Sequence, residues 1–495
     1  MQRRYLTYAA AIASVLGLTY CSSGSVDQQP GVAVPVPGVS SAVTYSFDLG
    51  VVDPATHKYY VTDRTNKAID SFDPATGVVT QFKNAGYAGC NSGGTGGGST
   101  NTPYVPMAGC VNITTTGIIF PNSAPGSSGV PVFAAGTLVT NNDLDGPDGL
   151  DIVGGNLYVG DVNHLWVVNR TTGATVGSVA IPNTGLKQGF RSDEGCFDPV
   201  DHLYAIALTG DPNTPLYTIL DTTAAEISGG VPTVIGYVLM NDSTGAPAAG
   251  LEACAFDTRG FAAGTGFMWL NNDGSTANPN GEMDGIPIAD LLAMKGLAAN
   301  KKVVFAGPLT ATADFNAATT SAPACALGGG GACGGVAPIV IALPALCDPT
   351  GLALGPGTDV GAMCRPGTIG HRMDFVIVTA PATAPVSTVV AGAGGGDQIT
   401  YDATSKKWYL ADSRQTANNL SCGAGTAVTC PLTPQVVVVD GTSHAVVARL
   451  ASGNNSHSIA VDGPAGRVFS PFTNSSASGG GAAFPNGGLN LFSTQ

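Results

Sequence analysis

Ionisable side chains recur at one fixed position of a repeated sequence pattern. In five segments, an aspartate that opens a turn is preceded, five residues earlier, by a carboxylate or a histidine. A sixth segment lacks the turn aspartate, but its register places Asp148 at the same position. In the third segment a second alignment replaces Asp193 with Glu194. The complete set is Asp48, Asp148, Asp193 or Glu194, Glu252, Asp397 and His457.

If these side chains converge, they can do electrostatic chemistry. Neighbouring carboxylates repel one another, which raises their pKa values unless a cation or hydrogen bonds offset the charge. A ring of oxygen ligands suits Ca²⁺, the expected ion, or Mg²⁺. Adding His457 would let Mn²⁺ or Zn²⁺ compete. The alternative is a structural role, in which the side chains hydrogen-bond to backbone N–H groups and ordered water. Both interpretations stay open.

The elements that must position these residues are strands. Residues 48–63 (DLGVVDPATHKYYVTD) and 397–412 (DQITYDATSKKWYLAD) share one pattern: apolar strand, Asp turn, aromatic-rich strand. Two more strands follow in most copies. Four antiparallel strands repeated six times indicate an all-β fold, a six-bladed β-propeller. Seven blades is the alternative, because residues 275–370 have room for another. The copies begin near residues 48, 148, 193, 252, 397 and 457.

The sequence also predicts which segment closes the propeller ring and which face carries the long insertions. The last copy ends at its third strand, so residues 42–48 are predicted to supply the fourth, which removes an open sheet edge. Residues 42–495 therefore form one propeller domain. Insertions at about 86–135, 275–370, 413–434 and 473–487 are predicted on one face. The inner strand of each blade should start at that face, which places the ionisable set at the channel mouth.

Cysteine usage indicates an oxidising compartment. The chain has 11 cysteines, and ten remain once Cys21 is set aside. No CxxC or CxxCH occurs, which argues against structural zinc and c-type haem. Disulfides that cross-link the inserted loops are expected. In the second alignment Cys196 and Cys254 lie level on adjacent inner strands and suit a bond between blades. Four pairs are near neighbours in the sequence, Cys90 and Cys110, Cys325 and Cys333, Cys347 and Cys364, and Cys422 and Cys430, and Cys196 and Cys254 are the more distant pair.

The first residues predict export. Residues 1–21 combine two arginines with a short apolar run, as export signals do. Leu18–Cys21 resembles the lipobox of bacterial lipoproteins, in which the cysteine carries the lipid, so lipidation of Cys21 is expected. Residues 22–41 are Ser-, Gly- and Pro-rich and predict a flexible tether. The expected location is the bacterial outer membrane, cell surface or periplasm through this anchor, with plain secretion as the alternative.

The amino-acid composition limits the classes of molecule that the protein is expected to bind. Only 11% of residues are charged, and the net charge of −14 argues against nucleic acid or an anionic membrane surface as a partner. Membrane contact is expected only through the lipid anchor, and the chain is expected to be a monomer. No Gly-x-Gly-x-x-Gly opens a helix after a strand, so no nucleotide cofactor is expected. Gly-x-Ser-x-Gly and His-Glu-x-x-His motifs are also absent.

The blade cores resemble the YVTN, NHL and gluconolactonase-like propellers. The segments YYVTD (59–63), LYVGD (157–161) and WYLAD (408–412), with Asp-Pro-x-Thr-Gly turns, carry the resemblance over about half of the chain. The resemblance implies a propeller with a divalent metal held in the channel by acid and amide side chains. It also implies lactone hydrolase or lyase activity. This chain has no asparagine at the aligned positions, although Asn272 and Asn455 are near.

Three functions follow as hypotheses. The first is a binding propeller that recognises a small polar ligand, or an extracellular protein or glycan, through its stapled face, with a divalent cation at the channel mouth. The second is a metal-dependent lactone hydrolase or lyase. In that case the cation polarises a carbonyl, and His457 or Glu252 acts as general base. The third is a structural matrix or adhesion protein.

Overall fold

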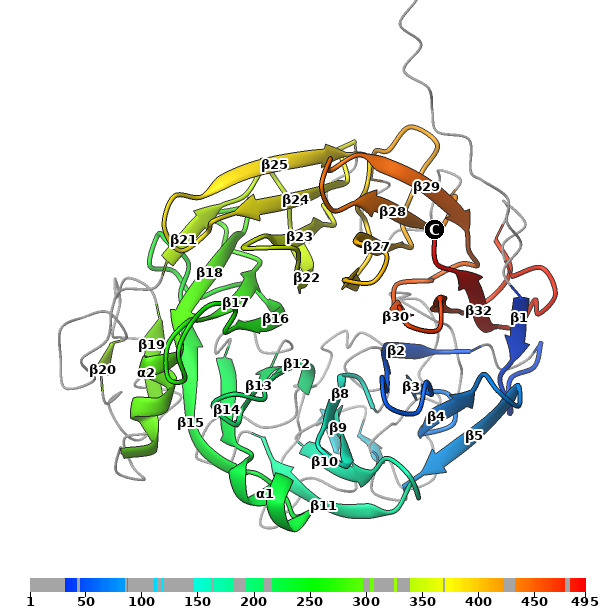
Figure 1. Ribbon diagram of the computed structural model, residues 1–495, viewed down its shortest axis with the longest axis horizontal. Coiled ribbons are helices and arrows are strands. Elements are labelled where there is room, and N and C mark those ends of the chain that lie inside the picture. The colour runs from blue at the N-terminus through cyan, green and yellow to red at the C-terminus, as the bar shows by residue number, and fades with distance from the viewer. Residues whose placement is uncertain are drawn as a thin grey trace, which may run out of the picture.

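Seven four-stranded antiparallel blades surround a central axis (Figure 1). The architecture comes from a computed structural model. It describes residues 32–41, 45–84, 87, 111–113, 117–119, 147–161, 164–181, 192–208, 216–296, 303–306, 325–326, 339–367, 370–421, 432–476 and 481–495. Within these ranges, no helix is both long and apolar enough to cross a bilayer.

The first four blades follow the chain in order, each beginning at the innermost strand. Blade A contains β2 (Phe47–Val52), β3 (Tyr59–Asp63), β4 (Ala68–Asp73) and β5 (Val78–Lys83). Blade B contains β8 (Leu150–Val153), β9 (Asn156–Asp161), β10 (His164–Asn169) and β11 (Thr175–Ala180). Blade C contains β12 (Ser192–Asp198), β13 (Leu203–Leu208), β14 (Leu216–Asp221) and β15 (Thr233–Met240). Blade D contains β16 (Leu251–Asp257), β17 (Phe267–Asn272), β18 (Glu282–Pro287) and β21 (Ile339–Ala342).

The remaining blades bring the chain back to its start. Blade E contains β22 (Pro349–Leu354), β23 (Val360–Cys364), β24 (Asp374–Thr379) and β25 (Val386–Ala391). Blade F contains β26 (Ile399–Asp402), β27 (Lys407–Asp412), β28 (Gln435–Asp440) and β29 (Val446–Ala451). Blade G contains β30 (Ala460–Asp462), β31 (Arg467–Phe472), β32 (Gly488–Ser493) and the N-terminal β1 (Val32–Pro35).

The six-bladed prediction was wrong, and the seven-bladed alternative is confirmed. Residues 275–370 were expected to be one long insertion within the fourth copy. Instead, β18 and β21 complete blade D, and residues 349–391 form the separate blade E. Blade E escaped detection because its inner strand, PTGLAL, lacks the turn aspartate that marked the other copies.

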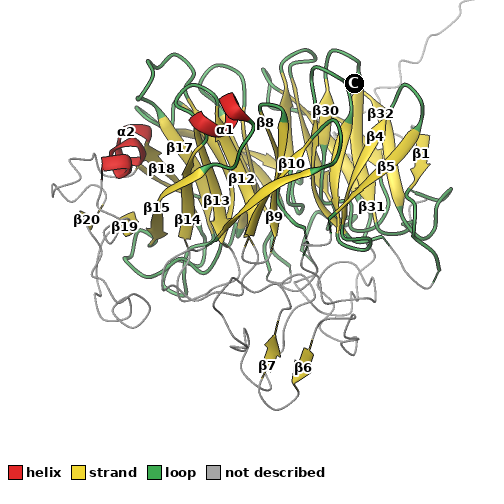
Figure 2. Ribbon diagram, turned by 90° about the horizontal axis from the view of Figure 1, so that it is seen from below, coloured by secondary structure: helices red, strands yellow, loops and turns green. Residues whose placement is uncertain are grey.

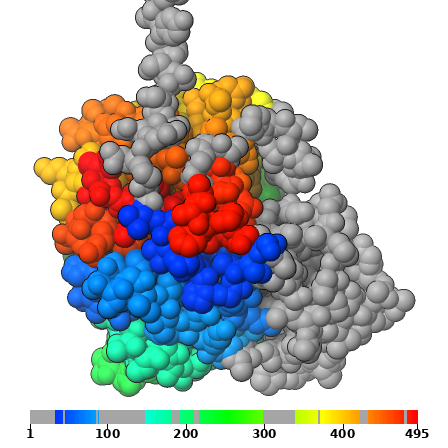
Figure 3. All heavy atoms as spheres, turned by 90° about the vertical axis from the view of Figure 1, so that its right-hand side faces the viewer, coloured from blue at the N-terminus to red at the C-terminus, as the bar shows by residue number. Residues whose placement is uncertain are grey.

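The ring closes with a different segment from the one predicted. Val34 of β1 pairs with Leu489 of β32, so β1, within the predicted tether, supplies the last strand. Residues 42–48 do not, because Phe47 and Asp48 already belong to β2. Figure 3 shows the result on the surface: the first described residues, in blue, lie against the last, in red.

The blades pack through apolar clusters that each draw on two neighbours. Tyr59 of blade A stacks on Phe469 of blade G with ring centroids 4.9 Å apart. Phe375 of blade E meets Trp408 of blade F edge-on at 5.2 Å. Such aromatic contacts add to the burial that holds adjacent blades together. Near the axis, glycine lets the backbones of blades B and C approach closely. A Cβ on Gly149 would overlap the Asp193 carbonyl oxygen of blade C.

The two faces of the ring differ. Inner strands begin at the face that carries the connections between blades, and Figure 2 shows β6 (Val111–Ile113) and β7 (Gly117–Ile119) beyond that face. We call it the loop face. The opposite face carries the Asp turns and the helices α1 (Thr223–Ser228) and α2 (Ile288–Ala293), with the 3-10 turn η2 (Met294–Gly296) after it. We call it the turn face.

One predicted insertion lies elsewhere. The insertion at residues 275–370 was predicted on the face where the inner strands begin, together with the other insertions. The long segment instead follows β18, so it connects the third and fourth strands of blade D and leaves from the turn face. Two of its pieces, β19 (Val303–Ala306) and β20 (Cys325–Ala326), extend blade C outward from β15. Much of the insertions at 86–135 and 413–434, and part of that at 473–487, lie outside the described residues.

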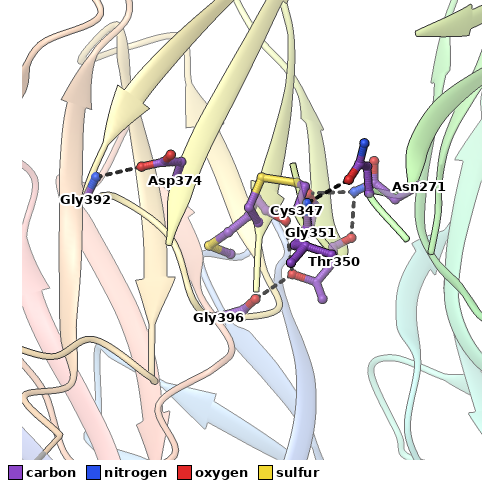
Figure 4. The surroundings of a disulfide bond; sticks show 11 residues. Asn271, Cys347, Thr350, Gly351, Asp374, Gly392 and Gly396 are labelled. Carbon is purple, nitrogen blue, oxygen red and sulfur yellow. Dashed lines mark hydrogen bonds between the residues drawn. A yellow bond between two sulfur atoms is a disulfide. The ribbon is translucent and has the colours of Figure 1, made fainter. Parts of the chain in front are cut away.

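Two disulfides are described. Cys196–Cys254 joins the inner strands of blades C and D, as expected for a bond between blades. Cys347–Cys364 lies within blade E (Figure 4). Nearby, Asn271 of blade D donates its side-chain amide to the carbonyl oxygens of Thr350 (2.8 Å) and Gly351 (3.0 Å). Disulfides indicate folding in an oxidising environment. The side chains of the other predicted cysteines, and Cys21, lie outside the described residues.

Candidate functional site

The ionisable set gathers where the inner strands begin, at the loop face. In blade A, Phe47 pairs with Asp63 and Gly50 with Val61, and the same offset in blades C and D aligns Asp48 with Asp193 and Glu252. The alignment that uses Asp193 is therefore the structural one, and Glu194 follows it on β12. In blade E, which was not predicted, Thr350 occupies the aligned position, and its hydroxyl donates to the Gly396 carbonyl at 2.6 Å.

Arginine opposes the carboxylates of blades A and B. The Arg64 guanidinium lies 2.6 Å from an Asp48 oxygen and donates from Nε to Asp148 Oδ1 at 2.6 Å. All three side chains are nearly inaccessible to solvent. His457 joins the group through Nε2, which lies 3.3 Å from Asp48 Oδ1, while its Nδ1 faces the Asn455 carbonyl at 2.8 Å. Its ring stacks on Phe47.

A second arginine serves blades D and F. Arg365, directly after β23, forms an ion pair with Asp397 and lies 3.7 Å from a Glu252 oxygen. Arg414 adds a further positive charge in the same region. Burial, reinforced by the charge of Arg365, lowers the pKa of Arg414 to about 9. The loop-face end of the channel is thus a layer of alternating charges, which we call the ionic layer: Asp48, Arg64, Asp148, Glu252, Arg365, Asp397 and Arg414.

Glu194 differs from these residues because none of the described arginines forms an ion pair with it, although the charge of Arg365 acts on its carboxyl. Its side chain is 7% exposed. Burial, followed by the charges of Glu252 and Asp193, raises the pKa of the Glu194 carboxyl well above its usual range. Asp151, one blade away, is also shifted: burial raises the pKa of Asp151 to about 7, although its carboxylate accepts the Ile152 N–H at 2.8 Å.

A cavity of about 300 Å³ lies on the channel axis next to the ionic layer. All seven inner strands, or the residues directly before them, contribute to its wall. Glu194, Asp151 and Asp397 are its carboxyl-bearing members, and most of the remaining wall is apolar or glycine. Gln398 is held in place, because it donates to the Gly50 carbonyl (3.1 Å) and accepts from Ser458 (2.7 Å).

No metal centre is evident among the described side chains, where no group of three or more His, Cys, Asp or Glu residues is arranged to hold an ion. Of the predicted ligands, Asp48, Asp148, Glu252 and Asp397 face arginine, and His457 faces Asp48. Asp193 and Glu194 lie beside Glu252 without forming such a group. The divalent cation, with calcium favoured, stays a prediction.

The arginines of the ionic layer were not predicted from the sequence. Arg64 and Arg365 each follow the last residue of a second strand, and Arg414 comes two residues after β27. The chain has only 20 lysines and arginines, so three arginines near one repeat position were a usable signal. The turn aspartates behave as expected. Asp402, for example, accepts the N–H groups of Thr404 (3.0 Å) and Ser405 (2.8 Å).

Comparisons with known proteins support the fold and nothing finer. No protein-family model matches the chain, and neither does any curated protein. Among solved structures, Kuenenia stuttgartiensis hydrazine synthase is similar over 93% of this chain and 99% of that one, with a TM-score of 0.51 and 10% identity. The RRP9 WD40 repeats follow at TM-score 0.48 and 6% identity, covering 95% and 99% of the two chains. The chain is a β-propeller, and its resemblance to the YVTN, NHL and gluconolactonase-like group stays a prediction.

Proposed function

We propose that this chain is an exported binding protein that holds a small polar ligand in its central channel. One observation carries the proposal: a cavity of about 300 Å³ on the axis, walled by all seven blades, with the acidic residues Glu194 and Asp151 in its lining. That volume is at the lower end of the range of small-molecule sites, which combine apolar walls with a few convergent polar groups.

The position of the cavity supports a ligand inside the ring. Arginine–carboxylate pairs occupy the loop-face end of the channel. Toward the turn face, lining residues such as Val52, Thr400 and Val461 are half-buried, whereas Asp48 and His457 at the opposite end are buried. A ligand would therefore contact the inner strands, at greater depth than the loop-face binding expected from the sequence.

Blocking the cavity tests the proposal. Thr400 lines the cavity, so Thr400→Trp should fill part of it. The matched control is Val386→Trp on the exposed outer strand β25, where Val386 is 62% exposed. A library of small polar compounds of each charge would be screened by thermal shift. We expect hits that stabilise the wild type and Val386→Trp but not Thr400→Trp. Equal shifts in all three proteins would refute channel binding.

Export and anchoring belong to the proposal as well. The described disulfides favour an oxidising compartment, and Cys21 is the candidate lipid acceptor. Expression of the full chain in a bacterium with labelled fatty acid should label the wild type and not Cys21→Ser. Labelling of both proteins, or of neither, would contradict lipidation at Cys21.

The cation and the catalytic roles are not part of the proposal. His457 is engaged at both ring nitrogens, and Glu252 faces Arg365, so neither is arranged as an available base. Elemental mass spectrometry of the purified chain tests the cation directly. One divalent ion per chain, lost in Asp148→Asn, would restore the metal site.

A further inference from the structure

We propose that the channel cavity takes an organic ammonium ion, with the charged nitrogen at Glu194 and a hydrocarbon body against the apolar wall. The inference rests on the proposed function, since it names the class of ligand for the same cavity. Three features of the described residues carry it: the wall, the Glu194 carboxyl and the charge of the lining.

The wall is suited to a hydrocarbon group. Aliphatic residues of five inner strands line the cavity, among them Leu49, Val51, Val52, Leu150, Leu352 and Ile399. Burying apolar surface against such a wall contributes roughly 25 cal/mol per Å². A fully hydrated metal ion would gain nothing from it. The ligand should therefore carry carbon as well as charge.

Glu194 supplies the polar end. Glu194 lines the cavity and is 7% exposed. Among the described residues, the charge of Arg365 acts on its carboxyl, but no hydrogen bond or ion pair joins the two side chains. The arginine that faces this region, Arg365, is committed to Asp397 and Glu252. A largely buried carboxylate is stabilised by a nearby positive charge, and a ligand that brings N–H donors and such a charge would supply it.

The charge of the lining selects the sign of the ligand. The described lining includes three carboxyls, Asp151, Glu194 and Asp397, and neither lysine nor arginine. A carboxylate or phosphate ligand would oppose the ionisation of these carboxyls and bring no N–H donor, whereas a cation favours their ionised form. A neutral ligand would give Glu194 only an uncharged hydrogen-bond donor, which binds a carboxylate more weakly than an ammonium group does. The Gln398 side chain is not free to reorient toward the ligand, because its amide oxygen already accepts hydrogen bonds from the Ser458 hydroxyl and the Ile459 N–H.

Matched probes test the inference by calorimetry on the full chain. Cyclohexylmethylammonium, cyclohexylmethanol and cyclohexanecarboxylate share one body and differ in charge, and n-butylammonium with n-butanol repeats the comparison at smaller size. At about pH 8 the amines are charged, since alkylammonium groups titrate near 10. We expect each ammonium to bind about 10- to 100-fold more tightly than its alcohol, because a charge-assisted hydrogen bond replaces a neutral one. The carboxylate should not bind.

Variants assign the preference to Glu194. Glu194→Gln should abolish the preference for ammonium while leaving the alcohols little changed. The control is Glu226→Gln on α1, where the carboxylate pairs with His202 far from the channel, and it should behave as wild type. Glu194→Gln removes a largely buried acid that forms no ion pair with a described arginine, so folding is expected, and the comparison of probes on the wild type stands by itself.

The outcomes separate this inference from the proposed function. Equal affinity for ammonium and alcohol, a preference that survives Glu194→Gln, or no binding by either ammonium would overturn the inference. So would Ca²⁺ alone displacing the amines and losing affinity in Glu194→Gln, because the site would then belong to a metal. Neutral or anionic hits that Thr400→Trp abolishes would keep the channel as a ligand site while rejecting its ligand class.

Discussion

At the scale of single residues, the channel end is governed by charges that cannot reach water. Arg64 is 4% exposed and lies between Asp48 of blade A and Asp148 of blade B. Each of these ions alone would lose hydration on folding without compensation. Together they form a bridge across the gap between two blades, so the arginine contributes to the ring as well as to the ionic layer.

Removing that arginine should be costly. Arg64→Met leaves two buried carboxylates without their counter-charge, and we expect it to lower the free energy of unfolding by about 3–5 kcal/mol. The control Arg372→Met removes a guanidinium that is 56% exposed and lies 3.4 Å from Asp374. Its effect should be at most about 1 kcal/mol. Urea unfolding compares the two, and similar midpoints would show that the buried pairing contributes little.

At the scale of elements, closure of the ring depends on a four-residue strand. β1 completes blade G and covers the edge of β32, which would otherwise offer unpaired backbone groups to another chain. Within β1 the two valines differ: Val34 is 8% exposed and packs with Tyr45 and Leu489, whereas Val32 is 68% exposed.

This difference gives a matched pair of substitutions. Val34→Asp places a charge in the seam between blades A and G and should lower the free energy of unfolding by about 3 kcal/mol. Val32→Asp keeps the same chemistry at an exposed position and should change it by about 0.5 kcal/mol or less. Thermal and urea unfolding measure both. If Val32→Asp proved as damaging as Val34→Asp, the closing strand would not pack as described.

The two described disulfides should stabilise unequally. Cys196–Cys254 spans 58 residues and joins two blades, whereas Cys347–Cys364 spans 17 within one. In the chain-entropy account the longer loop is worth about 4 kcal/mol and the shorter about 3 kcal/mol. Double Cys→Ser variants of each pair, unfolded in urea without reductant, check the order. A larger loss from the Cys347–Cys364 pair would indicate that local packing outweighs loop length.

At the scale of the whole molecule, buried acids set the response to pH. Burial raises the pKa of Asp70 and Asp290 to about 6 and that of Asp273 to about 7. Each folded pKa lies above the unfolded value of about 4. Their contribution to stability is therefore fully present below about pH 4 and is lost as pH rises through about 6 to 7.

We therefore expect the thermal midpoint to fall as the pH rises from about 5 to about 8. Asp290→Asn should flatten part of this slope, because Asp290 lies buried on α2 and would no longer ionise. Asp440→Asn is the control, since hydrogen bonds from Ser443 and Thr442 lower the pKa of that turn carboxylate, which titrates below the window. A midpoint that rises between these pH values would contradict the assignment.

Local patterns in the sequence determined the blade as a unit. Alternating apolar strands, Asp turns and the aromatic second strand are short-range features, so six of seven blades and the turn roles of residues such as Asp402 could be predicted. The position of the ionisable set at the start of the inner strands also followed from the repeat. Blade E was hidden because PTGLAL lacks the turn aspartate, and β1 was hidden because four residues in a Pro-rich stretch carry no period.

Only the tertiary structure decided what the ionisable set faces. Arg64, Arg365 and Arg414 follow second strands. Arg64 bridges Asp48 of its own blade and Asp148 of the next blade, and Arg365 reaches Asp397 and Glu252 of the two blades beside its own. Such pairs depend on the number of blades and the angle between them, which no local pattern carries. The same holds for Glu194. Its sequence neighbours place it on β12, but its place in the cavity lining, without an ion pair to any described arginine, follows from which side chains the closed ring brings within reach.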